Sequence, residues 1–326
     1  MENRSKIFDV IKFIAIFLVV WGHAIMCIDH QFQKELVDII YTFHMPLFMT
    51  ISGYFASNSF NRPVREFTYR KFIQLLLPAL AWSIIEVAWH YSLGTGYSLR
   101  DSFIGNSWFL KTLFAISVVV YLLKKTHIND WVLFSVSCAI FFAIPNASTL
   151  KFNEMYFYFW IGYFMKKYPL NIKAMTTCSL ICLFLFVYLY CIRDYFEFIH
   201  WLPMTINTIQ SDTATLAINY SLGLTGTITV IYGLQSVEHL ICNCRIYDLM
   251  AKFGRYTLQI YVLQTFFLIF GMSALVGQPQ TMASGCIICI IVSVFTIACS
   301  ITTTHILDRI SMVSTILFGK LSFSGK

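Results

Sequence analysis

Long apolar runs separated by short polar segments repeat along the whole chain of 326 residues. A helix needs about 20 predominantly apolar residues to cross the hydrocarbon core of a bilayer. Ten segments approach or reach this length, and we expect each to form a membrane-spanning helix. They are 7–28, 36–57, 72–93, 107–123, 130–145, 152–165, 173–191, 212–237, 254–275 and 283–306. The fifth and sixth segments are short, so each could be tilted or partly re-entrant.

The composition supports a membrane protein. Hydrophobic residues make up 58% of the chain and charged residues 12%, whereas a soluble domain carries about 25% charged residues. We therefore expect an all-α fold: a polytopic integral membrane helix bundle with about ten transmembrane helices, forming a single domain over residues 1–326. The lipid bilayer is the expected partner, and the expected location is multi-pass in the cell membrane (inner or plasma membrane). The net charge of +7 does not indicate nucleic acid, because the basic residues are spread between the apolar segments.

Lys and Arg are distributed unevenly between alternate loops. Of the 23 Lys and Arg residues, Lys12 and Lys111 lie inside predicted spans, and only four lie in the loops that would be outside if the N-terminus is cytoplasmic. The remaining 17 lie in the inner segments or at the inner ends of the spans. This asymmetry is the one expected from the positive-inside rule. It favours an even number of spans, with both the N- and C-termini in the cytoplasm.

The ten cysteines show no disulfide or zinc spacing, and most lie within apolar runs. Cys242 and Cys244 form a C-x-C pair with no second pair nearby, so we expect no metal site. The first apolar run, 7–28, is too long for the core of a signal peptide and lacks a small-residue cleavage site. We expect it to be retained.

The first predicted span carries three ionisable residues: Asp9, Lys12 and His23. Lys12 and His23 are separated by 11 positions, which places them about 20° apart around a helix and about 16 Å apart along it. Asp9 lies near the same line. Because ionisable groups inside a span are costly and mark functional sites, this pattern favours a polar face lining a cavity. Two alternatives stay open: a local Asp9–Lys12 ion pair, and a packing role for His23.

The second and third spans contain further polar groups. His44 and Ser52 flank Pro46, which removes a backbone hydrogen bond and should kink the helix. This span is either the wall of a cavity or an ordinary kinked helix. Glu86, in the third span, is expected at a depth similar to that of His23 and could orient its imidazole, as the acid of a hydrolase triad does. A local pair between Glu86 and His90 is the alternative.

Several short motifs occur in a recognisable order. They are D-x-x-K at 9–12 with Gly22-His23, F-H-M-P-L-F at 43–48, S-G-Y at 52–54, Arg70-Lys71, W-F-L at 108–110 and G-R-Y-T-L-Q-I-Y at 254–261. Together they resemble the acyltransferase-3 family of membrane acyltransferases, in particular its fucose 4-O-acetylase-like members. The stretch from about 125 to 250 adds nothing diagnostic. At position 264 the family often has His, whereas this chain has Gln, which cannot take a proton at neutral pH.

The resemblance implies transfer of an acyl group, usually acetyl, from a coenzyme A thioester to a hydroxyl, often on a sugar. The expected function is therefore an acyl-CoA-dependent O-acyltransferase that uses acetyl-CoA, needs no metal and acts on a surface or lipid-linked glycan or another hydroxyl acceptor. A transporter or flippase for a polar solute is the alternative, since buried charges and kinked helices also occur there.

The candidate site residues fall into three groups. Expected catalytic residues are His23, Lys12 and Glu86. Expected donor-binding residues are Lys12, Arg70 and Lys71. Expected acceptor-binding residues are His44, Ser52, Trp108 and Gln264. Trp108 could stack on a sugar ring or serve as an interfacial anchor. His23 could act as a general base or carry the acyl group itself.

Overall fold

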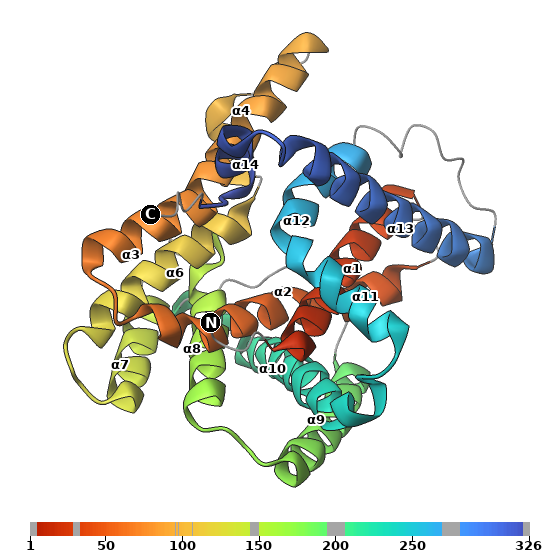
Figure 1. The fold of residues 1–326 in the computed structure, drawn as a ribbon. Helices are drawn as coiled ribbons and strands as arrows, with labels where there is room; N and C mark the ends of the chain where they lie inside the picture. The colour runs from red at the N-terminus through yellow and green to blue at the C-terminus, as the bar shows by residue number, and fades with distance from the viewer. Residues whose placement is uncertain are drawn as a thin grey trace. The chain divides into compact units, whose positions relative to one another are not determined.

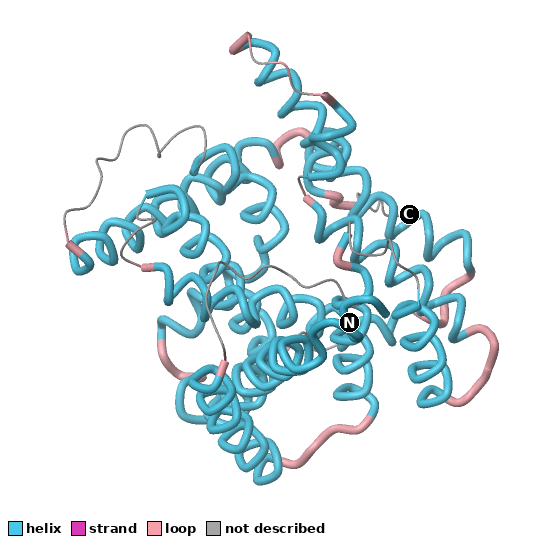
Figure 2. The backbone as a smooth tube through the Cα atoms, turned by 180° about the vertical axis from the view of Figure 1, so that it is seen from behind, coloured by secondary structure: helices cyan, strands magenta, loops and turns pink. Residues whose placement is uncertain are grey.

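The structure, a computed structural model, describes most of the chain. It covers residues 5–28, 33–94, 96, 98–105, 107–143, 150–193, 206–268 and 281–321, without the side chains of 206–211. These residues form helices joined by loops and turns, and no strand occurs among them (Figures 1 and 2). The predicted all-α fold is confirmed. The predicted cytoplasmic ends of the chain, and the last residues of the predicted spans 130–145 and 254–275, lie outside the described residues.

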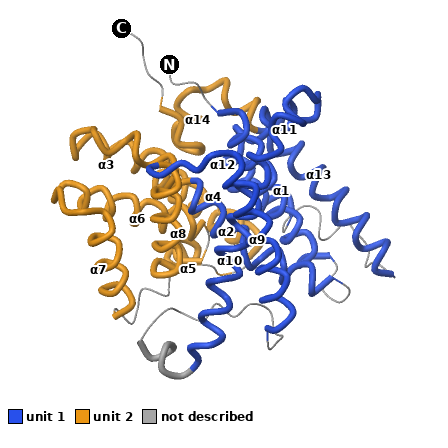
Figure 3. Tube along the Cα trace, turned by 90° about the horizontal axis from the view of Figure 1, so that it is seen from below, with its two compact units in different colours: residues 1–51, 167–202, 212–303 blue, residues 52–166, 203–211, 304–326 orange. Residues whose placement is uncertain are grey.

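The chain divides into two compact units, shown in separate colours in Figure 3. Unit 1 comprises residues 1–51, 167–202 and 212–303, and unit 2 comprises 52–166, 203–211 and 304–326. The helices mainly in unit 1 are α1 (Lys6–Ile28), α2 (Lys34–Ala56), α9 (Ile172–Ile192), α10 (Ile206–Ile241), α11 (Arg245–Phe253), α12 (Thr257–Thr265) and α13 (Met282–Leu307). Those of unit 2 are α3 (Val64–Lys71), α4 (Leu77–Ser92), α5 (Leu99–Gly105), α6 (Trp108–Lys124), α7 (Asp130–Ala143), α8 (Phe152–Lys167) and α14 (Ser311–Phe318). The single domain over 1–326 stays a prediction.

Each of the ten predicted spans is helical where it is described, but the helices differ in length. Six helices among the described residues are long and apolar enough to cross a membrane, or seven if the bent pair of α5 and α6 forms one span. The other three predicted spans correspond to α7 with 14 residues, α8 with 16 and α12 with nine. A polytopic membrane protein is therefore supported, and the count of ten stays a prediction.

Helix boundaries follow local chemistry. Residues 72–76 form a π-helical turn (η2) directly before α4, whose second residue is Pro78. A proline lacks the N–H that would bond the carbonyl four residues earlier, and a wider turn accommodates that loss. Asp212 is non-helical within α10, and its carboxylate accepts a hydrogen bond from the backbone N–H of Thr215 at 3.3 Å. This cap coincides with the predicted start of a span at 212.

Aromatic and small polar contacts join the helices of unit 1. Phe43 of α2 meets Phe186 of α9 edge to face, with ring centroids 5.9 Å apart. The hydroxyl of Ser179 on α9 donates to the carbonyl of Thr229 on α10 at 3.1 Å. Small polar residues are common at helix contacts within membranes because they allow close approach and hydrogen bonding.

Wide apolar faces remain exposed on α9 and α13. Leu180, Phe184 and Val187 on α9 are all more than half exposed. Ile287, Ile291 and Val294 on α13 are exposed to the same degree. Such continuous apolar faces are unfavourable in water and are expected for helices that contact lipid.

Aromatic side chains make several of the contacts within unit 2. Phe67 and Tyr121 stack with centroids 4.1 Å apart, and the Tyr121 hydroxyl donates to the carbonyl of Arg62 at 2.6 Å. The indole N–H of Trp82 on α4 donates to the carbonyl of Leu317 on α14 at 2.9 Å. The C-terminal helix is thereby anchored to α4.

Gly53, near the end of α2, lies directly against the backbone of α8. A Cβ atom at this position would stand 1.9 Å from the carbonyl oxygen of Phe159, well inside the van der Waals contact distance. The S-G-Y motif therefore has a structural reason: the two helix backbones touch, and only glycine leaves room for this contact.

We expect Gly53→Ala to lower the stability of the folded protein by about 2 kcal/mol or more, because the two helices must separate. Gly96→Ala is a suitable control, since a Cβ there would meet nothing within 4 Å. Thermal unfolding of the purified protein in detergent measures both variants. Equal midpoints for the wild type and Gly53→Ala would contradict the contact.

Candidate functional site

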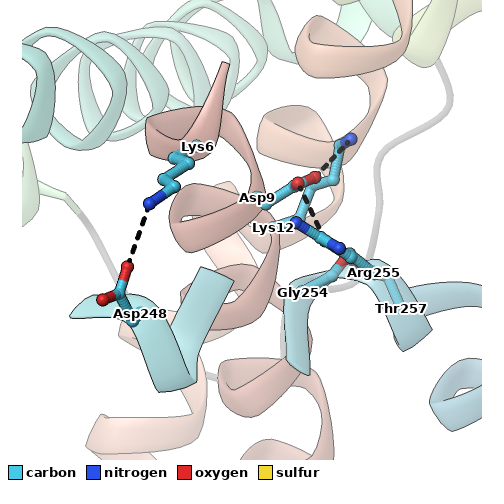
Figure 4. Close-up of polar contacts among 7 residues, drawn as sticks. All are labelled: Lys6, Asp9, Lys12, Asp248, Gly254, Arg255 and Thr257. Carbon is cyan, nitrogen blue, oxygen red and sulfur yellow. Dashed lines mark hydrogen bonds and ion pairs between the residues drawn. The ribbon is translucent and has the colours of Figure 1, made fainter. Parts of the chain in front are cut away.

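A buried carboxylate near the start of α1 pairs with two cationic side chains (Figure 4). The side chain of Asp9 is only 2% exposed, and its Oδ1 lies 3.5 Å from Nζ of Lys12. Its Oδ2 lies 3.7 Å from Nε of Arg255. The Asp9–Lys12 ion pair, which the sequence leaves open as an alternative, is thus present. Two cations offset the cost of desolvating the Asp9 carboxylate, and one of them is more than 240 positions away in the sequence.

The position of Arg255 depends on the residue before it. Gly254 lies so close to α1 that a Cβ atom would stand 1.8 Å from the carbonyl oxygen of Asp9. The hydroxyl of Thr257 donates to the carbonyl of Gly254 at 2.6 Å and steadies the short 3-10 turn Gly254–Tyr256 (η4). The G-R-Y-T segment therefore packs its backbone directly on Asp9, and this packing places the Arg255 guanidinium beside the carboxylate.

Helix α11 joins the same end of α1. Nζ of Lys6 lies 3.2 Å from Oδ1 of Asp248, and both side chains are largely exposed (Figure 4). The Tyr247 hydroxyl donates to Oε1 of Glu238 at 2.7 Å. Burial, and then the hydrogen bond to Glu238, raise the pKa of the Tyr247 phenol. The phenol therefore stays protonated and neutral at physiological pH.

Farther along α1, His23 lies against an aromatic group from α2. The rings of His23 and Tyr41 meet edge on with centroids 6.3 Å apart, and the Tyr41 ring lies 4.7 Å from that of His44. Nδ1 of His44 lies 2.9 Å from the carbonyl oxygen of Ile40, which favours the tautomer protonated at Nδ1. Tyr41 therefore links the two histidines that the sequence singles out.

Gln264 of α12 lies within hydrogen-bonding reach of the His23 imidazole. The residue is 1% exposed, and its Oε1 accepts no well-aligned hydrogen bond from the described residues. Loosely aligned hydrogen bonds of this kind are common at catalytic groups in the absence of substrate. The Gln that departs from the family pattern is thus an immediate neighbour of His23, and its amide can orient the ring without exchanging a proton.

Arg70 and Lys71 lie in unit 2, at the end of α3. Nε of Arg70 lies 2.8 Å from Oε1 of Glu66, which also pairs with Arg62 at 3.6 Å. Nζ of Lys71 stands 5.9 Å from the centroid of the Phe67 ring. These groups form a basic cluster, in which one carboxylate, Glu66, lies among three cations, Arg62, Arg70 and Lys71.

The other predicted residues of unit 2 have partners of their own. Glu86 accepts a hydrogen bond from the hydroxyl of Ser102. Nζ of Lys151 stands 4.9 Å from the centroid of the Trp108 ring. Burial lowers the pKa of Lys151, against an opposing effect of Glu154. Ser52 lies in α2 next to the Gly53 contact. The roles of Glu86 beside His23, and of Trp108 and Ser52 toward an acceptor, stay predictions.

A family model for an acyltransferase domain, that of acyltransferase-3, matches residues 6–305, nearly the whole chain. The chain belongs to the acyltransferase-3 family. It is thus a multi-pass membrane member of this family, as the motif order of the sequence indicates. No solved structure matches the chain.

Two curated relatives are nodulation proteins. The nodulation protein NolL of Sinorhizobium fredii is 36% identical over 152 residues, which cover 40% of this chain and 40% of the relative. NolL of Mesorhizobium japonicum is 29% identical over 180 residues, which cover 50% of this chain and 48% of the relative. The chain thus spans less than half the length of each of these relatives.

Two neighbours of the candidate residues were not predicted as site residues. Arg255 counts in the sequence as one of many inner basic residues, and nothing local links it to Asp9. Tyr41 precedes the F-H-M-P-L-F motif by two positions, and its spacing of three from His44 places both on one helix face. That spacing could have identified Tyr41, whereas the Asp9–Arg255 pair required the fold.

We expect Asp9→Asn to lower the free energy of unfolding by about 1–3 kcal/mol, because two cations lose a buried counter-charge. Asp248→Asn is the matched control: its ion pair with Lys6 is exposed and should contribute no more than about 1 kcal/mol. Denaturant unfolding in detergent compares the two variants. Equal losses would mean that burial does not strengthen the Asp9 pairs.

Proposed function

We propose that the chain is an O-acyltransferase that moves an acetyl group from acetyl-CoA to a hydroxyl on a sugar of a surface or lipid-linked glycan. The single observation that carries this proposal is the placement of His23. It lies in a predicted membrane span beside Gln264 and Tyr41, in a chain of the acyltransferase-3 family. Membership of this family favours acyl transfer over the transport of a polar solute.

The chemistry needs a proton acceptor. In one route, His23 takes the proton of the acceptor hydroxyl as its oxygen bonds to the thioester carbonyl carbon. The carbon–sulfur bond then breaks, and the CoA thiolate leaves with the proton returned by the imidazolium. In the other route, an imidazole nitrogen bonds to the acetyl carbon as the carbon–sulfur bond breaks, and the proton of the other ring nitrogen leaves with CoA as the thiol. The hydroxyl then attacks the acetyl-imidazole, and its proton returns to the imidazole. Both routes produce an ester and free CoA.

The donor is an anionic nucleotide thioester, so its binding requires cations. We assign this role to Lys12 in unit 1 and to Arg70 and Lys71 in unit 2. Lys12 keeps 27% of its side chain exposed although it pairs with Asp9, which supports access by a ligand. Its positive charge gains strength from the low dielectric around the buried carboxylate.

The residues assigned to acceptor binding are those whose side chains suit a sugar. A sugar offers hydroxyls for hydrogen bonds and apolar ring faces for aromatic stacking. We assign acceptor binding to His44, Ser52, Trp108 and Gln264, and an orienting role to Glu86, as the sequence predicts. The two relatives are named nodulation proteins, and this name does not identify the acceptor.

We expect His23→Ala to abolish acetyl transfer, because alanine can neither take the proton of the acceptor hydroxyl nor carry the acetyl group. Transfer of labelled acetyl from acetyl-CoA to glycan by the purified protein measures this, with thermal unfolding as the test of folding. A folded His23→Ala variant that still transfers acetyl would reject the assignment.

Gln264 is expected to be a positioning residue. Gln264→Leu should lower kcat by about tenfold or more and leave the KM for acetyl-CoA unchanged, since only the orientation of His23 is lost. Gln264→His restores a hydrogen-bonding partner and should retain activity within a few-fold of the wild type. Equal losses in the two variants, or a change in KM alone, would contradict this role.

A further inference from the structure

Arg255 is a half-exposed cation anchored on a buried carboxylate. Its side chain is 52% exposed, whereas that of Asp9 is 2% exposed, and they meet at Nε of the guanidinium, 3.7 Å from Oδ2. No other ion pair or hydrogen bond of the Arg255 side chain occurs within the part of the chain that the structure describes. The terminal nitrogens are therefore available to a ligand that arrives from solvent.

The local charge favours an anion. Lys12 and Arg255 both pair with Asp9, so these three side chains carry a net positive charge. The neighbouring Lys6–Asp248 pair balances its own charges at 3.2 Å. Figure 4 shows both groups along the same end of α1. An anion near Arg255 would meet two cations and a carboxylate that is already shielded by them.

The anchored guanidinium of Arg255 also favours one kind of anion, a phosphate group. A guanidinium presents paired N–H groups that match the oxygens of a phosphate, and it stays charged at all relevant pH values. The close packing of Gly254 on the Asp9 backbone fixes the start of the Arg255 side chain. Less conformational freedom is then lost when a phosphate binds.

We propose that Arg255, together with Lys12, binds a phosphate group of the acyl-CoA donor, and that Asp9 holds both cations in position. This inference rests on the proposed function, because it takes CoA as the donor. It adds a residue that the motif pattern does not assign. It also assigns phosphate binding to both the D-x-x-K and the G-R segments, which are far apart in the sequence.

The test measures binding without turnover. Purified protein in nanodiscs of zwitterionic lipid is titrated with CoA and with pantetheine, which lacks the phosphates. Arg255→Ala should weaken CoA binding about tenfold, the effect of one lost charge-assisted contact, and leave pantetheine binding unchanged. Arg255→Lys should lie between the wild type and Arg255→Ala. Arg245→Ala removes an exposed arginine of α11 and is the matched control, with no expected effect.

Three results would overturn the proposal. The first is equal CoA affinity in the wild type and Arg255→Ala. The second is the same loss for CoA and pantetheine, which would indicate a structural role only. The third is unchanged CoA binding with weaker retention, by Arg255→Ala, of an anionic phospholipid added to the nanodiscs, which would assign the bound phosphate to a lipid headgroup. If the wild type binds no CoA at all, the donor assignment of the proposed function fails, and that result is distinct from the first.

Discussion

Asp9 presents the main physical constraint in this structure: an ionised carboxylate in an apolar helix must keep its counter-charges. Burying it alone would cost several kcal/mol, and Lys12 and Arg255 offset that cost. Since Arg255 comes from a distant segment, the same interaction fixes where the chain after α11 meets α1. Helix α12 starts at this contact and carries Gln264 to His23. The pairing of charges at one end of α1 thus helps to position the candidate catalytic group farther along it.

The sequence predicts the helices well because hydrophobic length is a strong signal. All ten apolar segments are helical where they are described, and the start of the α10 span coincides with the Asp212 cap. The short helices α3, α5, α11 and α14 were not predicted. Each has seven to nine residues, and helices of this length are stabilised by tertiary packing more than by their own pattern.

The contacts of the candidate site also divide into those that sequence spacing predicts and those that only the fold creates. Asp9, Lys12 and His23 share a helix face by spacing alone, and the spacing also accounts for the Asp9–Lys12 pair. The motif order adds Gln264, which the structure places beside His23. The Arg255 contact could not be predicted, because residues 9 and 255 meet only through the backbone packing of Gly254. Glu86 illustrates the converse: its partner Ser102 lies in α5, a helix that hydropathy does not reveal.

In the proposed function, the donor enters with its phosphates at Lys12 and Arg255 and presents its thioester to His23. A structure of the chain in lipid nanodiscs with bound CoA, determined by electron cryomicroscopy, tests this claim most directly. We expect nucleotide phosphate within hydrogen-bonding distance of Arg255 and Lys12, and the CoA sulfur directed at the His23 imidazole. Nucleotide bound away from both cations, with the sulfur remote from His23, would contradict it.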